Sequence, residues 1–254
     1  MPSTSTLYRF HAILKRDIVN LALSPVLLLS NSVFPLLLML ILGYLTRGIY
    51  GGAEVSSYDY YGVTILIFTS LNVSMIASNS FMEKSLKQSN LRILHAPVRT
   101  SYLYISKIAA TFFFSTLSTL LLLALAHWLL DVHYGGSNWF AVALILIGFN
   151  LFSAALGVLM CCLCRSEETS NKILSFVNNL LALIGGLFFQ WDGLGRTAEI
   201  LSYLSPVKWV AEAVFCVIYD QDAGMALPLL GGFAVGTLVL LWGCSRIFHA
   251  EDYV

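Results

Sequence analysis

The sequence predicts an all-α, polytopic membrane protein, and three observations support this fold class. Of the 254 residues, 58% are hydrophobic and 11% are charged, whereas soluble domains carry roughly 25% charged residues. Several apolar runs reach the length of about 20 residues that a helix needs to cross about 30 Å of hydrocarbon. The charged residues gather between these runs. We therefore expect residues 1–254 to form a single transmembrane domain.

The N-terminal segment, residues 1–24, is predicted to be an amphipathic helix. The apolar residues near one helical stripe are Leu7, Phe10, Ile13, Leu14 and Ile18. The basic residues Arg9, Lys15 and Arg16 lie off that stripe, a pattern typical of a helix on the inner membrane surface. The alternative is a solvated helix start that leads into the first span. Because charges stand where a cleavable signal needs its apolar stretch, we expect the segment to be retained.

Six segments are expected to span the membrane. They run from Val26 to Leu45, Tyr61 to Phe81, Lys107 to Leu130, Trp139 to Leu163, Ile173 to Gln190, and Met225 to Phe248. Pro25 suits the first turn of the first span. Pro35 falls in the middle of that span, where its missing N–H should kink the helix unless a neighbouring helix compensates.

The distribution of Lys and Arg predicts that both termini are cytoplasmic, because cytoplasmic loops keep the positive excess. With the N-terminus inside, eleven of the fourteen basic residues lie on the cytoplasmic side. The outer side keeps Arg47, Arg196 and Lys208, together with eight of the fourteen acidic residues. The net charge of zero gives no electrostatic reason to expect a nucleic acid as a partner.

The cytoplasmic loop at residues 82–106 breaks the simple up-and-down pattern. It is too short and too charged to span, yet its leucine-rich stretch is apolar enough to pack against something. Pro97 should end its helix near Ala96. We expect a compact helix-turn element that folds onto its own bundle or docks into a partner.

The outer segment at residues 191–223 is also irregular. It contains two helical stretches of about a dozen residues on either side of Pro206, a length typical of re-entrant helices. A seventh span over residues 207–219 is disfavoured, because it would place Glu212 in the middle of the membrane.

Polar and small residues inside the spans give the only indications of a substrate path or of helix packing. The amides that could line a path are Asn72, Asn79, Asn150, Asn178 and Asn179. Burying an amide without a partner costs a few kcal/mol, so these side chains must face other helices or water, and they could equally hold helices together. Ser153 with Gly157, and Gly232 with Gly236, have the spacing of closely packed helices, within one bundle rather than across a dimer seam.

Motifs for catalysis and metal binding are missing from the sequence. It contains no GxxxxGK[ST] phosphate loop, no HExxH and no GxSxG, so we assign no catalytic residue. Cys161 and Cys164 form one CxxC, but a single pair cannot fill a tetrahedral zinc site. We interpret both as packing residues and predict no metal site, with redox or metal chemistry as the lesser alternative.

The order of these segments resembles a known family. The chain begins with an amphipathic entry helix containing KRD, which is followed by two spans and the loop EKSLKQSNLRILHAPVRTSYLYISK. The stretch SEETSNK follows the fourth span, and GLFFQWDGLGRTAEILSYLSPVKWVAEA precedes the last span. This arrangement is similar to the type-2 ATP-binding cassette permeases of prokaryotes, which share the fold of the eukaryotic G-type half-transporters. The similarity covers essentially the whole chain.

The resemblance implies roles for several segments. The loop after the second span would be the coupling helix that docks on the ATPase, with the matching positions Glu83, Lys84, Leu91, Arg92, Leu94, Pro97, Val98 and Arg99. The N-terminal segment would be the connecting helix that runs beside it. In the outer re-entrant pair, Ser205 replaces the asparagine of the family's usual Asn-Pro-Leu turn, which leaves the turn plausible.

The resemblance also implies a function. We expect a permease subunit of an exporter that moves an amphiphilic substrate, such as a drug, a peptide antibiotic or a lipid-like molecule. It would work in a prokaryotic cytoplasmic (inner) membrane with a second permease copy, identical or a sister chain. ATP and Mg would bind a separate nucleotide-binding subunit, since the extramembrane segments are short and no cofactor is expected on this chain.

Two other functions stay open at this stage. The first is an ATP-independent channel or secondary carrier. The absence of a central charged residue in any span argues against coupling to protons or sodium. The second is a membrane anchor for a cytoplasmic protein. An intramembrane enzyme is disfavoured because no convergent set of catalytic groups is present.

Overall fold

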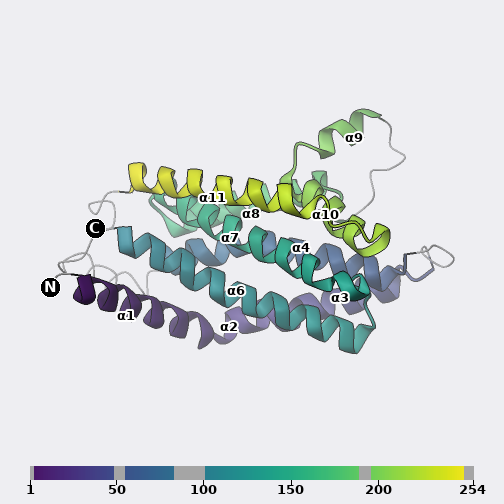
Figure 1. Cartoon of the computed structure of the whole chain (residues 1–254), viewed down its shortest axis with the longest axis horizontal. Coiled ribbons are helices and arrows are strands. Elements are labelled where there is room, and N and C mark those ends of the chain that lie inside the picture. Colours follow the sequence, from purple (N-terminus) through teal and green to yellow (C-terminus); the bar gives the residue numbers. More distant parts are fainter. Residues whose placement is uncertain (1–2, 49–54, 83–100, 189–195, 249–254) are drawn as a thin grey trace.

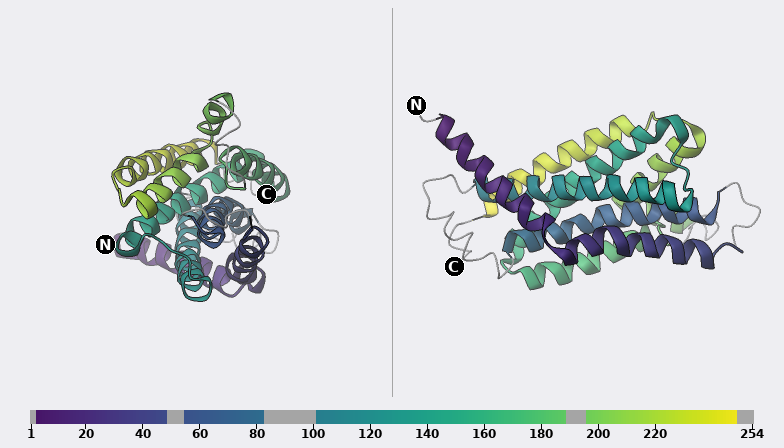
Figure 2. Two further views of the ribbon diagram at one scale, coloured as in Figure 1. Left: turned by 90° about the vertical axis from the view of Figure 1, so that its right-hand side faces the viewer. Right: turned by 90° about the horizontal axis from the view of Figure 1, so that it is seen from below.

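The computed structural model describes residues 3–48, 55–82, 101–188 and 196–248, and these ranges fold entirely into helices and short connections (Figure 1). Within them, five helical segments are long and apolar enough to cross a membrane. They are Pro25–Leu45, Ser57–Met82, Ser101–Leu130, Gly136–Cys164 and Ala226–Ile247. They lie side by side in an elongated bundle (Figures 1 and 2). The predicted all-α fold is confirmed.

The bundle has two ends that differ in what they hold. At the end we call the loop end, α4 (Ser57–Met82) finishes and α6 (Ser101–Leu130) begins. The first residues of α1 (Ser3–Ala22) and the last residues of α11 (Ala226–Ile247) lie at this same end (Figure 1). The opposite end holds two short helices within residues 196–215 (Figure 1). α1 crosses α6 obliquely and projects beyond the loop end (Figure 2).

The first span is irregular where its prolines predict it. Ser24 precedes α2 (Pro25–Leu28), so Pro25 stands in the first turn as expected. A π-helical turn, η1 (Leu29–Val33), then leads into α3 (Phe34–Leu45). Pro35, two residues after this turn, cannot donate to the helix ladder, and both prolines and π turns make a helix irregular. The Asn31 amide donates to the Leu27 carbonyl oxygen at 2.9 Å within this turn.

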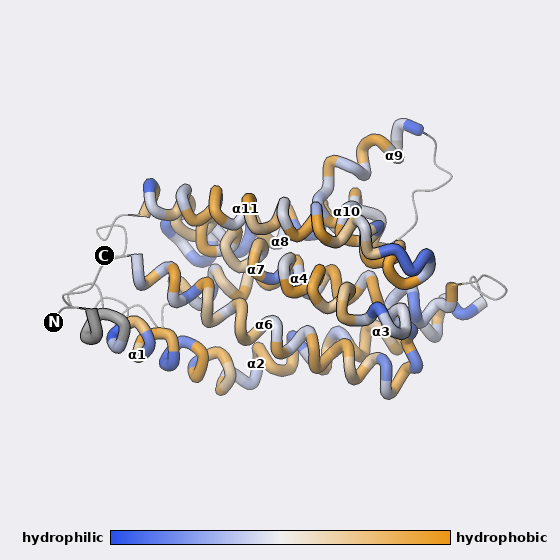
Figure 3. The backbone as a smooth tube through the Cα atoms, viewed as in Figure 1, coloured by the Kyte–Doolittle hydropathy of each residue, from blue (hydrophilic) through white to orange (hydrophobic). Residues whose placement is uncertain are grey.

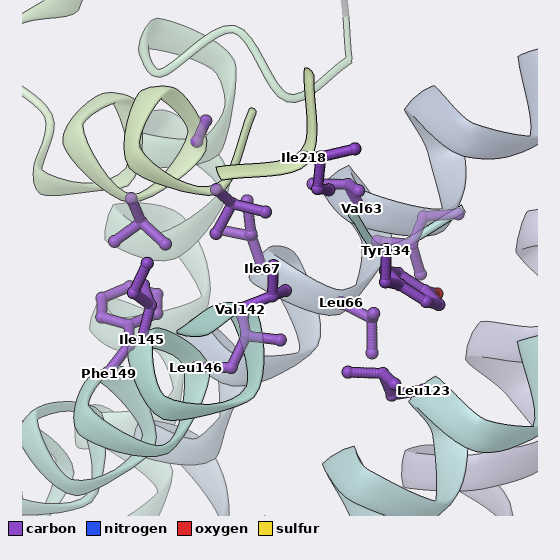
Figure 4. Close-up of a cluster of buried hydrophobic side chains, with 14 of the residues drawn as sticks. Val63, Leu66, Ile67, Leu123, Tyr134, Val142, Ile145, Leu146, Phe149 and Ile218 are labelled. Atoms are coloured by element: carbon purple, nitrogen blue, oxygen red, sulfur yellow. The ribbon is translucent and has the colours of Figure 1, made fainter. Parts of the chain in front are cut away.

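α4 is the central helix of the bundle, and it is buried on nearly all sides. It packs against α3, α6, α7 (Trp139–Cys164) and α8 (Glu167–Ile184). Its apolar residues join those of α6 and α7 in the main core, part of which Figure 4 shows around Leu66, Ile67 and Leu146. α7 approaches α4 so closely at Gly157 that a Cβ there would lie 1.9 Å from the Ser74 carbonyl oxygen. The interpretation of Ser153 and Gly157 as packing within the bundle is confirmed.

The outer helices expose apolar side chains, as expected of lipid-facing surfaces. The outward faces of α3 and α11 carry large exposed residues such as Phe34, Leu37, Leu238 and Trp242. Figure 3 shows hydrophobic residues along most of the helix lengths, with hydrophilic residues more frequent toward the two ends. The hydrocarbon of the bilayer can therefore cover these outward faces, which a soluble bundle would have to bury.

The fifth predicted span corresponds to α8, but with different limits. The helix starts six residues earlier than expected, at Glu167, and ends at Ile184. Ser166 caps it, since its side chain accepts from the Thr169 N–H. α8 carries the charged residues Glu167, Glu168 and Lys172 in its first two turns. It is therefore not among the five helices that are long and apolar enough to cross a membrane.

Residues 196–220 form two short helices and a π turn. They are α9 (Arg196–Ser202), α10 (Pro206–Phe215) and η3 (Cys216–Asp220). α10 packs its valine face against α4, α7, α8 and α11. α9 stands away from the bundle (Figure 1).

Candidate functional site: the junction between the N-terminal helix and the bundle

The predicted coupling residues lie outside the described part of the chain. This holds for Glu83, Lys84, Leu91, Arg92, Leu94, Pro97, Val98 and Arg99. The structure does describe the helices on both sides of them, α4 ending at Met82 and α6 beginning at Ser101. Residues 83–100 therefore connect Met82 of α4 to Ser101 of α6.

A buried ion pair fixes α1 to α6 near this point. The Lys107 Nζ lies 2.9 Å from the Asp17 Oδ1, and the two side chains are 1% and 0% exposed. The Ser106 hydroxyl donates to the other carboxylate oxygen of Asp17 at 2.9 Å. Arg16, whose side chain is 32% exposed, also donates to Asp17 Oδ1 at 2.9 Å. Asp17 thus accepts from three donors on two helices.

The free-energy cost of separating buried charges makes this junction resist sliding of α1 along α6. Removing two charges from water costs several kcal/mol each, and only excellent geometry with extra hydrogen bonds compensates for that cost. Sliding α1 along α6 would separate the charges in a medium of low dielectric. An apolar cluster supports the same contact, with Leu21 of α1 packed against Ile76, Ala110 and Phe114. α1 and the start of α6 are therefore expected to move as one body.

The three basic residues predicted for the connecting helix differ in their exposure and contacts. Arg9 and Lys15 are exposed, and Arg16 contacts Asp17. Sequence reasoning missed Asp17 itself. A signal was available, because Asp17 is an acidic residue that falls between Leu14 and Leu21 on the apolar stripe of an otherwise basic helix. A lone acid on a buried face requires a cationic partner.

A cavity of about 500 Å³ lies beside the ion pair. Its lining combines Asp17 and Lys107 with Asn79 and Ser80 of α4 and Glu167 of α8, while Leu21 and Leu27 supply an apolar part. A cavity with several polar groups is roomy and polar enough to hold water. The junction therefore borders a polar space that reaches the start of α8.

The amides proposed as a substrate path do not form one continuous lining. Asn178 is fully buried and its Nδ2 donates to Ser74 Oγ at 3.0 Å, to Asn72 Oδ1 at 3.2 Å and to the Leu71 carbonyl at 3.4 Å. Asn79 Oδ1 accepts from the side chain of Asn171. These contacts join α4 to α8 along a polar seam.

Two of the predicted amides lie apart from this seam. Asn150 is fully buried and donates to Thr119 Oγ1 at 3.1 Å, which joins α7 to α6. Asn179 is exposed on α8 and donates only within its own helix, to the Ser175 carbonyl at 2.8 Å. Of the five amides, Asn179 is therefore the one whose side chain faces away from the bundle.

The end opposite the loop end is held by hydrogen bonds between connections. Ser205 is buried, caps α10 by accepting from the Val207 N–H, and donates to the Leu181 carbonyl at 2.8 Å. The Leu181 carbonyl also accepts from the Gly185 N–H at 2.8 Å, so Ser205 supplies a second donor and joins the start of α10 to the end of α8. Tyr134 lies in the connection after α6 and is buried. Burial is the main reason that the pKa of its phenol is raised far above the ordinary value, and the nearby Asp59 carboxylate raises it further. Its phenol stays neutral at physiological pH.

The cysteines show no arrangement for metal binding in the described ranges. No group of three or more His, Cys, Asp or Glu side chains there could hold a metal ion. Cys161 is buried, and its Sγ contacts the Ser78 carbonyl oxygen at 3.7 Å. The thiols of Cys161 and Cys164 are both free.

The apolar helices, packed side by side in one bundle, define a polytopic membrane domain. The chain belongs to the ABC-2 type transporter family, whose sequence model matches residues 8–219. The predicted resemblance to type-2 ATP-binding cassette permeases is confirmed. No curated protein matches the chain. The domain shared by this family is a membrane permease domain without an ATPase site, and such permeases generally work with a separate ATPase subunit.

Proposed function

We propose that this chain is the permease subunit of an exporter that moves an amphiphilic substrate out of the cell across a prokaryotic cytoplasmic membrane. ATP and Mg would bind a separate nucleotide-binding subunit. The observation that carries this proposal is the buried Asp17–Lys107 ion pair, which fixes α1 to α6 directly after the predicted coupling loop, residues 82–106.

The proposed mechanism uses this rigid junction to transmit motion. Closure of two ATPase subunits on ATP would push residues 83–100, and α6 would receive that push at Ser101. Because the ion pair holds α1 to α6, both helices would move together relative to α8. A ligand can shift such an equilibrium only through different contact energies in the two states, and the docking of the loop on the ATPase supplies that difference.

The exposed face of α8 supports a second permease copy beside a polar path. It carries Lys172 and Asn179 among exposed apolar residues of the same helix, which are Ile173, Phe176, Leu180 and Leu183, whereas the exposed faces of α3 and α11 are mostly apolar. An amide or an ammonium facing acyl chains is costly, so such a face is expected to meet water or protein. We place the substrate path at this face, between two copies of the chain or between this chain and a sister chain.

Two adjacent amides test this placement. Replacing Asn178 by alanine should cost about 1 to 2 kcal/mol of stability, because it removes the hydrogen bonds that join α8 to α4. Replacing Asn179 by alanine should leave stability nearly unchanged and lower the export rate roughly fivefold to tenfold, the value of one hydrogen bond to the substrate. Thermal unfolding in detergent and substrate efflux from vesicles measure the two effects. Normal efflux in Asn179→Ala would argue against a path at this face.

The coupling assignment is tested by charge placed in the loop. The double variant Leu91→Asp and Leu94→Asp should lose co-purification with the co-expressed nucleotide-binding subunit, because the two leucines are expected to fill an apolar groove on that subunit. Membrane insertion should persist. The matched control is Ser85→Asp with Ser89→Asp, which adds the same charge at polar positions of the same loop.

The outcomes separate the proposed exporter from its alternatives. Association that survives Leu91→Asp with Leu94→Asp would contradict the coupling role of this stretch. Efflux that continues without any ATPase would support an ATP-independent channel or carrier instead. Normal efflux on depletion of this chain, with loss of a cytoplasmic protein from the membrane, would support an anchor.

A further inference from the structure

A groove between α10 and α11 lies on the outward surface near the end opposite the loop end. It encloses about 320 Å³. Its walls include Phe152 of α7, Tyr203, Trp209 of α10, and Leu229, Gly232 and Phe233 of α11. Ring faces and aliphatic side chains make up nearly all of this lining, and a Cβ at Gly232 would meet no atom within 4 Å. The groove therefore has the width and chemistry to take an alkyl chain.

The surroundings of the groove indicate that acyl chains reach it. Leu204, which lines it, is 78% exposed, and Leu227 at the start of α11 is 81% exposed. In a membrane domain, such exposed apolar residues contact the hydrocarbon of the bilayer. The Trp209 Nε1 donates to the Tyr203 carbonyl at 2.9 Å, and Trp and Tyr typically mark the level of the lipid headgroups. The groove thus begins at headgroup level and continues into hydrocarbon.

One positive and one negative side chain adjoin the rim of the groove through Tyr203, which lines it. The Lys208 Nζ lies 5.9 Å from the centroid of the Tyr203 ring. The Lys208 Nζ lies 3.5 Å from Glu212 Oε1, and these side chains are 17% and 30% exposed. Strong charge-assisted hydrogen bonds are shorter, at about 2.7 to 2.9 Å, so this pair is loose. The Tyr203 hydroxyl donates to Glu212 Oε1 at 2.7 Å and keeps the carboxylate at the rim.

We propose that this groove binds one zwitterionic glycerophospholipid from the adjacent leaflet, a site distinct from the proposed export path. One acyl chain lies along the aromatic walls. The phosphate binds the Lys208 ammonium, and the headgroup ammonium binds the Glu212 carboxylate. The rim carries both charges, so the lipid with both complementary charges fits better than an uncharged or purely anionic one.

Quenching of Trp209 by a brominated lipid tests the site. The other tryptophans, Trp128, Trp139, Trp191 and Trp242, are replaced by phenylalanine in the full-length chain. The protein is then reconstituted in phosphatidylglycerol vesicles that contain increasing fractions of brominated phosphatidylethanolamine. We expect half-maximal quenching at a mole fraction about tenfold lower than with brominated diacylglycerol, the effect of one charge-assisted hydrogen bond.

Two neighbouring glycines provide a matched control. Gly231 and Gly232 are both exposed, and neither has an atom within 4 Å of a built Cβ, but only Gly232 lines the groove. Gly232→Leu should fill the groove and raise the half-quenching fraction to the diacylglycerol level, whereas Gly231→Leu should leave it unchanged. Lys208→Gln should give the same loss as Gly232→Leu without filling the groove.

Three results would overturn the proposal. The first is equal quenching by phosphatidylethanolamine and diacylglycerol in the unsubstituted groove. The second is the same response in Gly231→Leu and Gly232→Leu, which would assign the quenching to the general surface of α11. The third is no quenching of Trp209 by any lipid, which would show that protein, such as a second copy of the chain, covers the groove.

Discussion

Replacing Lys107 by methionine should destabilise the bundle by about 2 to 3 kcal/mol, because it removes one buried, charge-assisted hydrogen bond from a carboxylate that keeps Arg16 as a cationic partner. The Asp17 carboxylate is fully buried, and the substitution removes its partner on α6. Ser106 and Arg16 still donate to Asp17, so the carboxylate stays partly compensated, but the ionic contact between α1 and α6 is lost. Unfolding by SDS or heat in detergent micelles measures the loss. Asp17→Asn should have a similar effect, since it leaves the Lys107 ammonium buried.

A second ion pair in the chain serves as the control. The Lys172 Nζ lies 2.7 Å from Glu168 Oε1 on α8, but both side chains are largely exposed. Exposed pairs contribute little, because water solvates the charges equally well when they are apart. Lys172→Gln should therefore change stability by very little. If Lys107→Met proved equally harmless, the junction would not be the rigid connection that the mechanism requires.

The double variant Asp17→Leu with Lys107→Met separates stability from coupling. Replacing a whole buried ion pair by apolar residues is often neutral, so most of the lost stability should return. The fixed position of α1 along α6 should not be restored, because apolar side chains do not require one specific pairing. We expect ATP hydrolysis by the assembled complex to continue while efflux falls, and parallel recovery of stability and efflux would mean that the pair has a structural role alone.

Replacing Gly157 by alanine should have a second large effect, with a loss of about 3 kcal/mol or more. The added Cβ would lie 1.9 Å from the Ser74 carbonyl oxygen, 2.6 Å from its carbonyl carbon and 2.8 Å from its Cα. All three atoms belong to the backbone of α4, so no side-chain rotation can relieve the overlap. α7 must move away from α4, which would open the packing around the central helix. The same unfolding measurement in detergent detects the loss.

Gly148 offers a control on the same helix. A Cβ there would approach the Leu230 side chain at 2.6 Å, at the far end of a flexible group that can rotate. Gly148→Ala should be close to neutral, helped by the better helix propensity of alanine, which amounts to about 1 kcal/mol. Equal stability of Gly157→Ala and Gly148→Ala would contradict the close approach of α4 and α7.

The sequence predicted the parts of this protein that depend on local pattern. The helical spans follow from runs of apolar residues, because a backbone in lipid must satisfy its hydrogen bonds internally. The irregular first span follows from Pro35, and the start of α10 follows from Ser205 before Pro206. The family also followed from the order of segments along the chain, since that order is itself a property of sequence.

The tertiary structure decided which polar residues act together. Asp17 and Lys107 are ninety positions apart, and the amides at Asn178 and Asn179 are neighbours with opposite surroundings. Composition alone cannot distinguish a buried hydrogen-bonded amide from one that faces outward, because the difference depends on which helix lies across from it. The sequence therefore determined that this chain spans a membrane as a permease of its family. Only the packing of helices determined where its charges are paired, because pairing in a low dielectric requires two groups within about 3 Å.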